Sequence, residues 1–396
     1  MRACTVFFSA GEASGDRLAA GLVRELARLR PDWRLTGIGS DAMQEAGLEL
    51  LLDIRHTSAI GITESLARLP SALIALRRAR RLIRQIRPDL FVAVDCQGIN
   101  LILARTARAA GAIVVYYIPP QNFLWDDIRR GREIVRRTDL MINLFEEGHR
   151  FYQQLGAHSV CTGHPLSSLI PRRDRQFPDP LKPTILLAAG ARKSEHRRFI
   201  PLLSAVARRI MDRYPQARFV SPAAGPAHAA LLAKAFAREG IPVTTGPGVT
   251  LFASADAAVI KSGTMALEAA IAGCPYCVLY RISRLSWLIM ARLWGLSKKL
   301  RYVSLPNILS RRELAREFLQ QAATPQALAE EALALLDNSE YRSSRLRGLS
   351  AFRESLTHDN PWREAAEAIC NFSENPATAP LQVVCALLLA EDNLLY

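Results

Sequence analysis

The chain has 396 residues, 49% of them hydrophobic, and its 51 Lys and Arg residues against 37 Asp and Glu give a formal net charge of +14. This length exceeds what one hydrophobic core usually serves, so we expect two domains, and no apolar run reaches the about 18 residues that a membrane-spanning helix needs. The basic excess favours an anionic partner, although much of it is Arg in an Ala- and Arg-rich chain.

The first predicted strand, residues 5–8, leads into the turn Ser9-Ala10-Gly11-Glu12-Ala13-Ser14-Gly15-Asp16. Gly11 and Gly15 allow a tight turn and a close approach to a ligand. A helix is predicted to begin near Asp16, and its free N–H groups can bind polar or anionic groups. Glu12 suits sugar hydroxyls better than phosphate. An ordinary strand-to-helix turn with a solvated Glu12 is the alternative interpretation.

The same alternation of strand and helix continues through the first 155 residues. An apolar N-terminal run, 3–10, follows a single cation, Arg2, and is followed at once by Glu12 and Asp16, so we expect no targeting segment. The alternation predicts a parallel, doubly wound sheet. The further predicted strands are 90–95, 113–117 and 140–144, and the predicted helices are 17–29, 70–86, 101–110 and 146–155.

A Pro-rich, charged stretch then interrupts the alternation, which restarts at residue 184 with strands at 184–189, 218–221, 243–245, 257–260 and 276–280. We therefore expect an N-terminal Rossmann-like domain (1–165), a linker (166–183), a second Rossmann-like domain (184–345) and a C-terminal helix and tail (346–396). Ligands in open α/β sheets bind at the carboxyl ends of strands, so two such domains are expected to face each other across a cleft.

Two turns of the second half suit phosphate chemistry. Arg192 and Lys193 follow Gly190 at a predicted helix start and could clamp a diphosphate, or they could be a solvated helix cap. Ser262, Gly263 and Thr264 offer hydroxyls and bare N–H groups at the next helix start. Glu268 lies one turn further on, where it could bind a ribose diol. The spacing of a Walker loop is absent.

Seven cysteines are dispersed along the chain, which indicates reduced thiols in a cytosolic protein. Cys274-Pro275-Tyr276-Cys277 resembles a redox dithiol motif. However, that motif should open a helix after a strand, whereas here it follows a predicted helix and leads into a strand. Buried packing is the better interpretation of these two cysteines.

Taken together, the motifs resemble the lipid A disaccharide synthase family over about residues 5–370. This resemblance implies the two-domain GT-B glycosyltransferase fold. It also implies an inverting reaction, without metal or cofactor, in which UDP-2,3-diacylglucosamine and 2,3-diacylglucosamine 1-phosphate give a β-1,6-linked disaccharide 1-phosphate and UDP. The motifs that carry it are Gly11-Glu12-Ala13-Ser14-Gly15-Asp16, Pro88-Asp89 through Asp95 and Asn100, Gly163-His164-Pro165, Ser262-Gly263-Thr264 with Glu268, and Tyr302-Val303-Ser304-Leu305-Pro306-Asn307.

The resemblance also implies roles for individual residues. Asp95, at the end of an apolar strand, is the expected base for the acceptor hydroxyl, although an Asp here could instead cap the next helix. Glu12 is expected to face the acceptor or donor sugar as a second catalytic residue. His164 is interpreted as a turn residue at the hinge. Substrate contacts are expected from Ser14, Arg192 (diphosphate), Ser262, Gly263, Thr264, Glu268 (ribose) and Asn307.

Three segments depart from the family pattern. Residues 119–127 lack the usual serines, residues 96–99 lack a second Asp, and Ala191 replaces a Ser before Arg192. The first two lie in the acceptor-side half. These two departures leave open that the protein is a transferase of the same fold that uses another acceptor. A non-catalytic UDP-sugar-binding protein is disfavoured by the presence of Asp95, Arg192 and Glu268, and nothing except charge suggests a nucleic-acid partner.

Two segments suit an anionic membrane surface. Residues 60–76 are rich in Ile, Leu and Ala and are followed by six arginines. Residues 287–296 are rich in Leu and Trp, with basic residues in and around them. A core helix with a solvated basic rim is the alternative. With the resemblance, these segments predict a cytoplasmic enzyme attached peripherally to the inner membrane. The resemblance also implies a homodimer, to which the apolar tail 381–390 could contribute.

Overall fold

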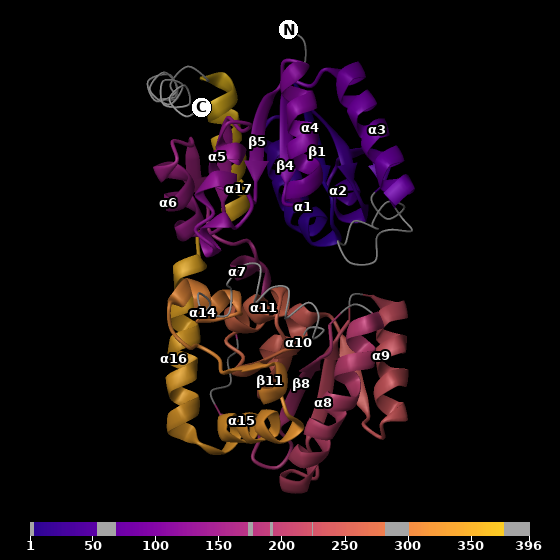
Figure 1. Cartoon of the computed structure of the whole chain (residues 1–396), viewed down its shortest axis with the longest axis vertical. Helices are drawn as coiled ribbons and strands as arrows, with labels where there is room; N and C mark the ends of the chain where they lie inside the picture. Colours follow the sequence, from indigo (N-terminus) through magenta and orange to yellow (C-terminus); the bar gives the residue numbers. More distant parts are fainter. Residues whose placement is uncertain are drawn as a thin grey trace, which may run out of the picture. The chain divides into compact units, whose positions relative to one another are not determined.

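The computed structural model describes residues 4–53, 69–172, 177–190, 193–223, 225–281 and 301–375. These residues form two compact units (Figure 1). The first contains the described residues up to Pro165 and those from His358 onward, and the second is Leu166–Thr357. Each unit has its own parallel sheet.

Seven parallel strands form the sheet of the first unit within its described residues, in the order β3-β2-β1-β4-β5-β6-β7. The central strands are mostly apolar and almost entirely buried, as expected for parallel strands covered on both faces. The strands are β1 (Thr5–Ala10), β2 (Arg34–Gly39), β3 (Glu49–Asp53), β4 (Leu90–Val94), β5 (Ile113–Tyr117), β6 (Leu140–Asn143) and β7 (Ser159–Cys161).

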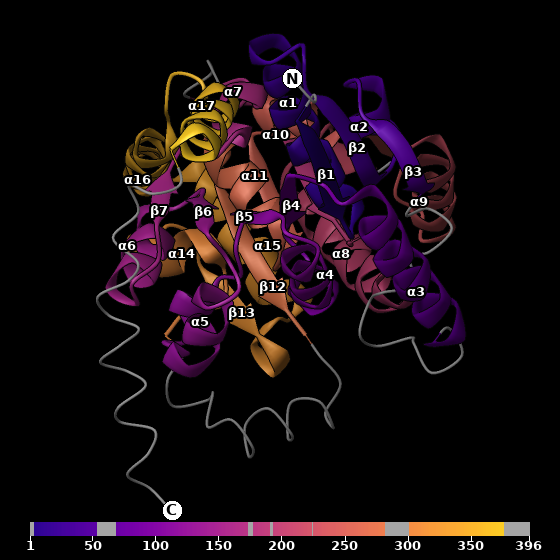
Figure 2. The ribbon, with the colours of Figure 1, turned by 90° about the horizontal axis from the view of Figure 1, so that it is seen from above.

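Helices cover both faces of this sheet. Figure 2 shows its strands between α1 and α17 on one side and α3, α4 and α5 on the other. α17 is the last described helix, yet it packs on α1 through Trp362, whose indole N–H donates to the Leu18 carbonyl over 2.8 Å. The helices are α1 (Ala13–Leu29), α2 (Asp41–Glu45), α3 (Leu69–Ile86), α4 (Gln97–Ala109), α5 (Ile128–Val135), α6 (Glu146–Gln154) and α17 (Pro361–Glu374), with a 3-10 turn, η2, at Asn122–Leu124.

The second unit repeats the plan. Within its described residues, six parallel strands lie in the order β10-β9-β8-β11-β12-β13. Helices α8, α9 and α15 share one core with Ile185, Leu187 and Val259. The strands are β8 (Thr184–Ala188), β9 (Arg218–Pro222), β10 (Val243–Gly246), β11 (Ala257–Lys261), β12 (Tyr276–Tyr280) and β13 (Glu317–Leu319). The helices are α7 (Leu166–Leu169), α8 (Lys193–Arg213), α9 (Pro226–Arg238), α10 (Gly248–Ser254), α11 (Thr264–Ala272), α14 (Leu305–Ser310), α15 (Pro325–Asp337) and α16 (Ser339–Leu356). A 3-10 turn, η3, lies at Gln320–Ala322.

The expected domain limits can be placed on these elements. The expected boundary at 345/346 lies inside α16, which continues to Leu356, and the chain rejoins the first unit from His358. The start of the expected linker is helical in α7 and packs in the second unit. There the Arg353 guanidinium donates to the carbonyls of Ser167 and Ile170, each over 2.9 Å.

The described cysteines are free thiols, and both cysteines of the CxxC motif are fully buried. Cys277 packs in the main core of the second unit, where burial raises its thiol pKa well above the ordinary value. This confirms the packing interpretation. No helix of the described part of the chain is long and apolar enough to cross a bilayer.

Candidate active site

The strand order of the first sheet reverses between β1 and β4, and the loops that follow these two strands diverge there. In doubly wound sheets this switch point is where ligands bind. The loop after β1 holds Gly11 and Glu12, and the loop after β4 holds Asp95 and Cys96. The two carboxylates predicted to be catalytic are therefore brought to neighbouring strand ends.

Asn100 ties these two strand ends together. Its side chain is fully buried, and its Nδ2 lies 2.8 Å from the Val94 and Asp95 carbonyls and 3.1 Å from the Ser9 carbonyl. Its Oδ1 accepts from the Ser9 hydroxyl over 2.7 Å. A buried amide bonded on both sides fixes a unique local geometry. Asn100 therefore positions the backbone of Asp95.

Asp95 lies in a strained turn. Asp95 and Cys96 have φ values of +48° and +43°, a left-handed conformation that is uncommon outside glycine. The Tyr116 hydroxyl donates to the Asp95 carbonyl over 2.9 Å, which helps to hold the turn. Burial is the main influence on the Asp95 carboxyl and raises its pKa. A carboxylate of raised pKa at a switch point is suited to accept a proton.

Glu12 precedes the first turn of α1 and is exposed, and Ser14 lies partly exposed within that turn. The loops after β1 and β4 are in close contact, because a Cβ on Gly11 would lie 2.5 Å from the Cys96 sulfur. Burial, followed by the charges of Glu12 and Asp95, raises the Cys96 thiol pKa to about 11. Cys96 therefore lies within the field of both carboxylates and stays a neutral thiol.

Asp16 and His164 both lie within motifs that carry the family resemblance. The contacts of both residues point to a role in holding the fold. The buried Asp16 carboxylate accepts from the backbone N–H groups of Ser40 over 2.6 Å and Ala42 over 3.2 Å, which fixes the start of α2. His164 is buried beside the Phe145 ring, and burial lowers its pKa to about 3. A neutral, buried imidazole agrees with the interpretation of His164 as a turn residue.

The segment that departs from the family pattern, 119–127, follows β5, the neighbour of β4. Its backbone is held by the Tyr152 hydroxyl, which donates to the Pro120 carbonyl over 2.5 Å. Its Trp125 side chain is 50% exposed. The departure therefore lies at the same carboxyl edge of the sheet as Asp95, where it can affect what binds there.

The second sheet has its own switch point, between β8 and β11. Ser262 is buried after β11, and its hydroxyl donates to the Val303 carbonyl over 3.3 Å. Gly263 precedes the first turn of α11 with φ +148°, and Gly263 and Thr264 are exposed. The exposed start of α11 can thus present N–H groups to an anion. Arg192, the predicted diphosphate contact, lies outside the described residues.

Glu268 is one turn into α11 and faces the start of α10. A Cβ on Gly248 would lie 3.0 Å from the Glu268 Oε2 atom, so Gly248 leaves room for this carboxylate. Glu268 is partly exposed at the same edge of the sheet. This position remains compatible with the predicted ribose contact.

Asn307 differs from the expectation. Its side chain is fully buried, its Nδ2 donates to the Ala315 carbonyl and a Glu317 oxygen over 2.7 and 2.8 Å, and its Oδ1 accepts from the N–H groups of Leu314 and Ala315 over 2.7 and 3.1 Å. These bonds use the full hydrogen-bonding capacity of the amide. The structure therefore uses the side-chain amide of Asn307 to hold the surrounding loop, so we expect no ligand contact from this amide.

Glu317, at the start of β13, is a residue that the sequence analysis missed. Its carboxylate accepts from the N–H of Val303 over 2.7 Å and from both the N–H and the hydroxyl of Ser304, over 2.9 and 2.6 Å. Since the Val303 carbonyl in turn accepts from Ser262, Glu317 positions the loop behind the predicted phosphate site. The only available signal was its place in a strand of three residues, which is too short to recognise by pattern.

The family model described as lipid-A-disaccharide synthetase matches residues 6–369. The chain belongs to the lipid-A-disaccharide synthetase family. A lipid-A-disaccharide synthase of Coxiella burnetii (strain CbuG_Q212) is 33% identical over 377 residues, which cover 93% of this chain and 98% of the relative. One from Pseudomonas aeruginosa (strain LESB58) is 35% identical, with 92% and 97% covered.

Solved structures that are similar to this member of the lipid-A-disaccharide synthetase family share its fold. A UDP-GlcNAc 2-epimerase from Neisseria meningitidis bound to UDP-GlcNAc has a TM-score of 0.58 at 13% identity, covering 93% of this chain and 98% of that one. Os79 from O. sativa in complex with UDP has a TM-score of 0.57 at 10% identity, covering 93% and 100%. The predicted family, glycosyltransferase class and GT-B fold are therefore confirmed.

Proposed function

We propose that this protein joins UDP-2,3-diacylglucosamine to 2,3-diacylglucosamine 1-phosphate, giving the β-1,6-linked disaccharide 1-phosphate and UDP. The observation that carries the proposal is the partly buried Asp95 carboxylate, held at the switch point of the first sheet in a chain of the lipid-A-disaccharide synthetase family. The catalytic and substrate-binding roles below are part of this proposal.

In the proposed step, the 6-hydroxyl oxygen of the acceptor attacks C1 of the donor glucosamine. The bond from C1 to the diphosphate oxygen breaks as the new glycosidic bond forms, and UDP leaves with the bonding electrons. The Asp95 carboxylate takes the hydroxyl proton. Glu12, exposed at the end of β1, and Ser14 orient sugar hydroxyls by accepting and donating hydrogen bonds.

The second unit is proposed to bind the donor nucleotide. The N–H groups at the start of α11, with Ser262, Gly263 and Thr264, stabilise the negative charge of the departing diphosphate. Glu268 accepts hydrogen bonds from the ribose hydroxyls. Asn307 acts indirectly in this proposal, through the loop that it holds behind Ser262.

The test is to incubate the wild-type protein with both lipid substrates and follow disaccharide 1-phosphate and UDP by mass spectrometry. Both products are expected in equal amounts. UDP release without disaccharide would mean donor hydrolysis. Donor binding without either product would contradict the proposed acceptor.

A transferase with another acceptor is the alternative; the family match does not favour it, and one feature of the chain keeps it testable. Residues 119–127, which depart from the family pattern, lie at the carboxyl edge that holds Asp95. If the standard acceptor fails, acceptors with other acyl chains or without the 1-phosphate are to be tried with the same donor. If only one of these other acceptors gave a product, the proposed acceptor would be wrong and that acceptor would take its place.

We also propose peripheral attachment of the protein to the cytoplasmic face of the inner membrane. α3 supports it: Leu73 and Ile74 are 45% and 63% exposed, and the arginines of the next turns, Arg77, Arg78 and Arg81, are exposed too. Apolar side chains edged by arginine suit an anionic lipid surface. Residues 60–68 and the second predicted membrane segment, 287–296, lie outside the described residues, as does the tail 381–390. The homodimer stays a prediction.

Sedimentation with phospholipid vesicles tests this attachment. The wild-type protein is expected to bind vesicles that contain phosphatidylglycerol and to leave them at high salt. A Leu73→Ser/Ile74→Ser variant is expected to bind at least about tenfold more weakly, since it loses two exposed apolar side chains that the lipid surface would bury. Leu231→Ser, which changes an exposed leucine of α9, is the matched control. Equal binding of both variants would argue against α3 as the contact.

A further inference from the structure

An ion pair joins the end of β11 to the start of α8 at the switch point of the second sheet. Lys261 is the last residue of β11, which pairs with β8, and Glu195 lies in the first turn of α8, which follows β8. The Lys261 Nζ and Glu195 Oε1 atoms are 2.9 Å apart. The pair therefore spans the carboxyl ends of the two strands between which a ligand of this sheet is expected.

The carboxylate of this pair occupies a position suited to an anion. It lies against Gly190, directly after β8, because a Cβ on Gly190 would be 2.2 Å from the Glu195 Oε2 atom. Gly190 has φ +92°, which disfavours any other residue there. The first turn of a helix attracts negative charge, so Glu195 supplies at α8 the kind of charge that a phosphate would bring.

The ammonium of the pair lies next to the predicted phosphate loop. A Cβ on Gly263, which precedes the first turn of α11, would be 3.9 Å from the Lys261 Nζ atom. The Lys261 side chain is 30% exposed and that of Glu195 is 15% exposed, so solvent screens the pair only in part. A cation held at this place can reach an anion at the start of α11 without a change of backbone.

We infer that Lys261 binds the diphosphate of the donor, and that Glu195 holds the Lys261 ammonium until the diphosphate replaces the carboxylate. This inference rests on the proposed function, in which the donor is a UDP sugar. When UDP leaves, Glu195 recovers its partner. Glu195 therefore lowers the affinity for UDP by competition, while Lys261 raises it through a charge-assisted contact.

The test measures dissociation constants of UDP and of uridine, which lacks phosphate, for Lys261→Met and Glu195→Gln. Lys261→Met keeps most of the length of the side chain without its charge and is expected to weaken UDP binding about tenfold or more. Glu195→Gln can still accept a hydrogen bond from Lys261 and is expected to tighten UDP binding several-fold. Uridine binding is expected to be unchanged in both variants. In the double variant, UDP is expected to bind as weakly as in Lys261→Met alone.

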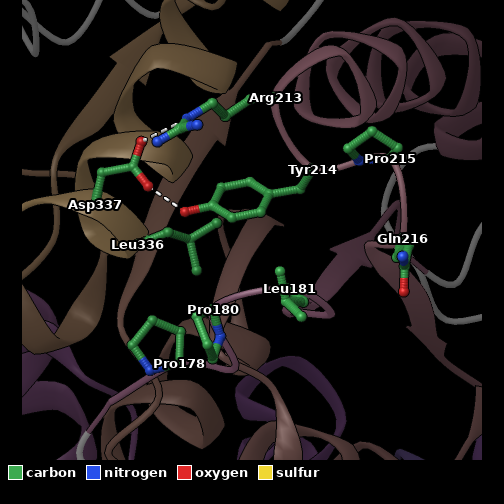
Figure 3. A pocket seen from close by; sticks show the side chains of 9 residues that line it. All are labelled: Pro178, Pro180, Leu181, Arg213, Tyr214, Pro215, Gln216, Leu336 and Asp337. Carbon is green, nitrogen blue, oxygen red and sulfur yellow. Dashed lines mark hydrogen bonds and ion pairs between the residues drawn. The ribbon is translucent and has the colours of Figure 1, made fainter.

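A matched control removes a cation from the opposite end of the same sheet. Figure 3 shows Arg213 reaching Asp337, with their Nε and Oδ2 atoms 3.5 Å apart, in a pocket lined by Leu181 and Gln216 near the amino ends of β8 and β9. Arg213→Met also loses one positive charge. It is expected to leave UDP binding unchanged, which separates a local contact from an effect of net charge.

The outcomes distinguish this inference from the proposed function. Wild-type protein that binds UDP, with an unchanged constant in Lys261→Met, would overturn the role of Lys261 and leave the proposed donor standing. An equal loss of UDP and uridine affinity would show that Lys261 holds the shape of the loop before α11 and does not bind the phosphates. Wild-type protein that does not bind UDP would overturn the proposed donor, and with it this role of Lys261.

Discussion

Asp95→Asn is expected to slow disaccharide formation by about 10²- to 10⁴-fold, the usual contribution of a general base, while UDP binding is unchanged. Asparagine is the sharpest substitution here because it keeps the shape of the side chain and tolerates the left-handed backbone that Asp95 adopts at φ +48°. Alanine would add backbone strain to the loss of the carboxylate. The rate is to be measured with both lipid substrates at saturation.

The dependence of the rate on pH provides a second test of the role of Asp95. Burial raises the pKa of the Asp95 carboxyl, and only the ionised form can take a proton. The wild-type rate is therefore expected to fall as the pH is lowered through this raised pKa, above the range of an ordinary aspartate. Asp95→Asn is expected to lack this acidic limb.

The matched control for this variant is Asp139→Asn, at the amino end of the same sheet. There the Asp139 carboxylate accepts from the Val114 N–H over 2.8 Å and pairs with Arg108. Its loss should affect stability and leave the pH profile unchanged. If Asp95→Asn kept more than a tenth of the activity with its acidic limb intact, the base would have to be sought elsewhere, first at Glu12.

The sequence predicted the central strands of both sheets well, for a physical reason. Parallel strands covered on both faces are continuous apolar runs, as in β4 and β8. The strands β2, β3, β7 and β13 were not predicted. β2 contains two glycines and β3 begins with an exposed Glu49, whereas β7 and β13 have three residues each, so none of them gives a clear pattern.

The site was predictable where a residue follows a recognisable strand. Asp95 and Ser262 are in this class, since the end of an apolar run places them at the carboxyl edge of a sheet. Asn307 is in the opposite class. Its partners are mainly backbone atoms of residues 314 and 315 and the carboxylate of Glu317, so only the folded loop shows that its amide is already occupied.

Long-range packing is the other property that sequence patterns did not reveal. Trp362 of α17 lies against Gly21 of α1, 341 positions earlier in the chain, so closely that a Cβ on Gly21 would be 2.2 Å from the indole ring. Nothing local marks Gly21, which on propensity alone is an unfavourable residue within a helix. The contact explains the glycine, and it leads to the second large effect that we expect.

Trp362→Ala is expected to lower the free energy of unfolding of the first unit by about 3 kcal/mol, through the lost ring contacts and the lost bond to the Leu18 carbonyl. Gly21→Ala alone is expected to destabilise by about 1–3 kcal/mol, because the ring is held by that bond and cannot move aside easily. Hydrogen exchange of the α1 and α17 amides, with urea unfolding followed by circular dichroism, measures both changes.

Combining the two changes is expected to reverse the sign of the Gly21 effect. Once Trp362 is alanine, the space over residue 21 is open, and Gly21→Ala should stabilise α1 by about 1 kcal/mol through its higher helix propensity. A double-mutant cycle isolates this coupling from the separate effects. If Gly21→Ala had the same sign in both backgrounds, α17 would not be packed on α1 in solution. The sign reversal would show that the glycine is present to admit the ring of a helix from the far end of the chain.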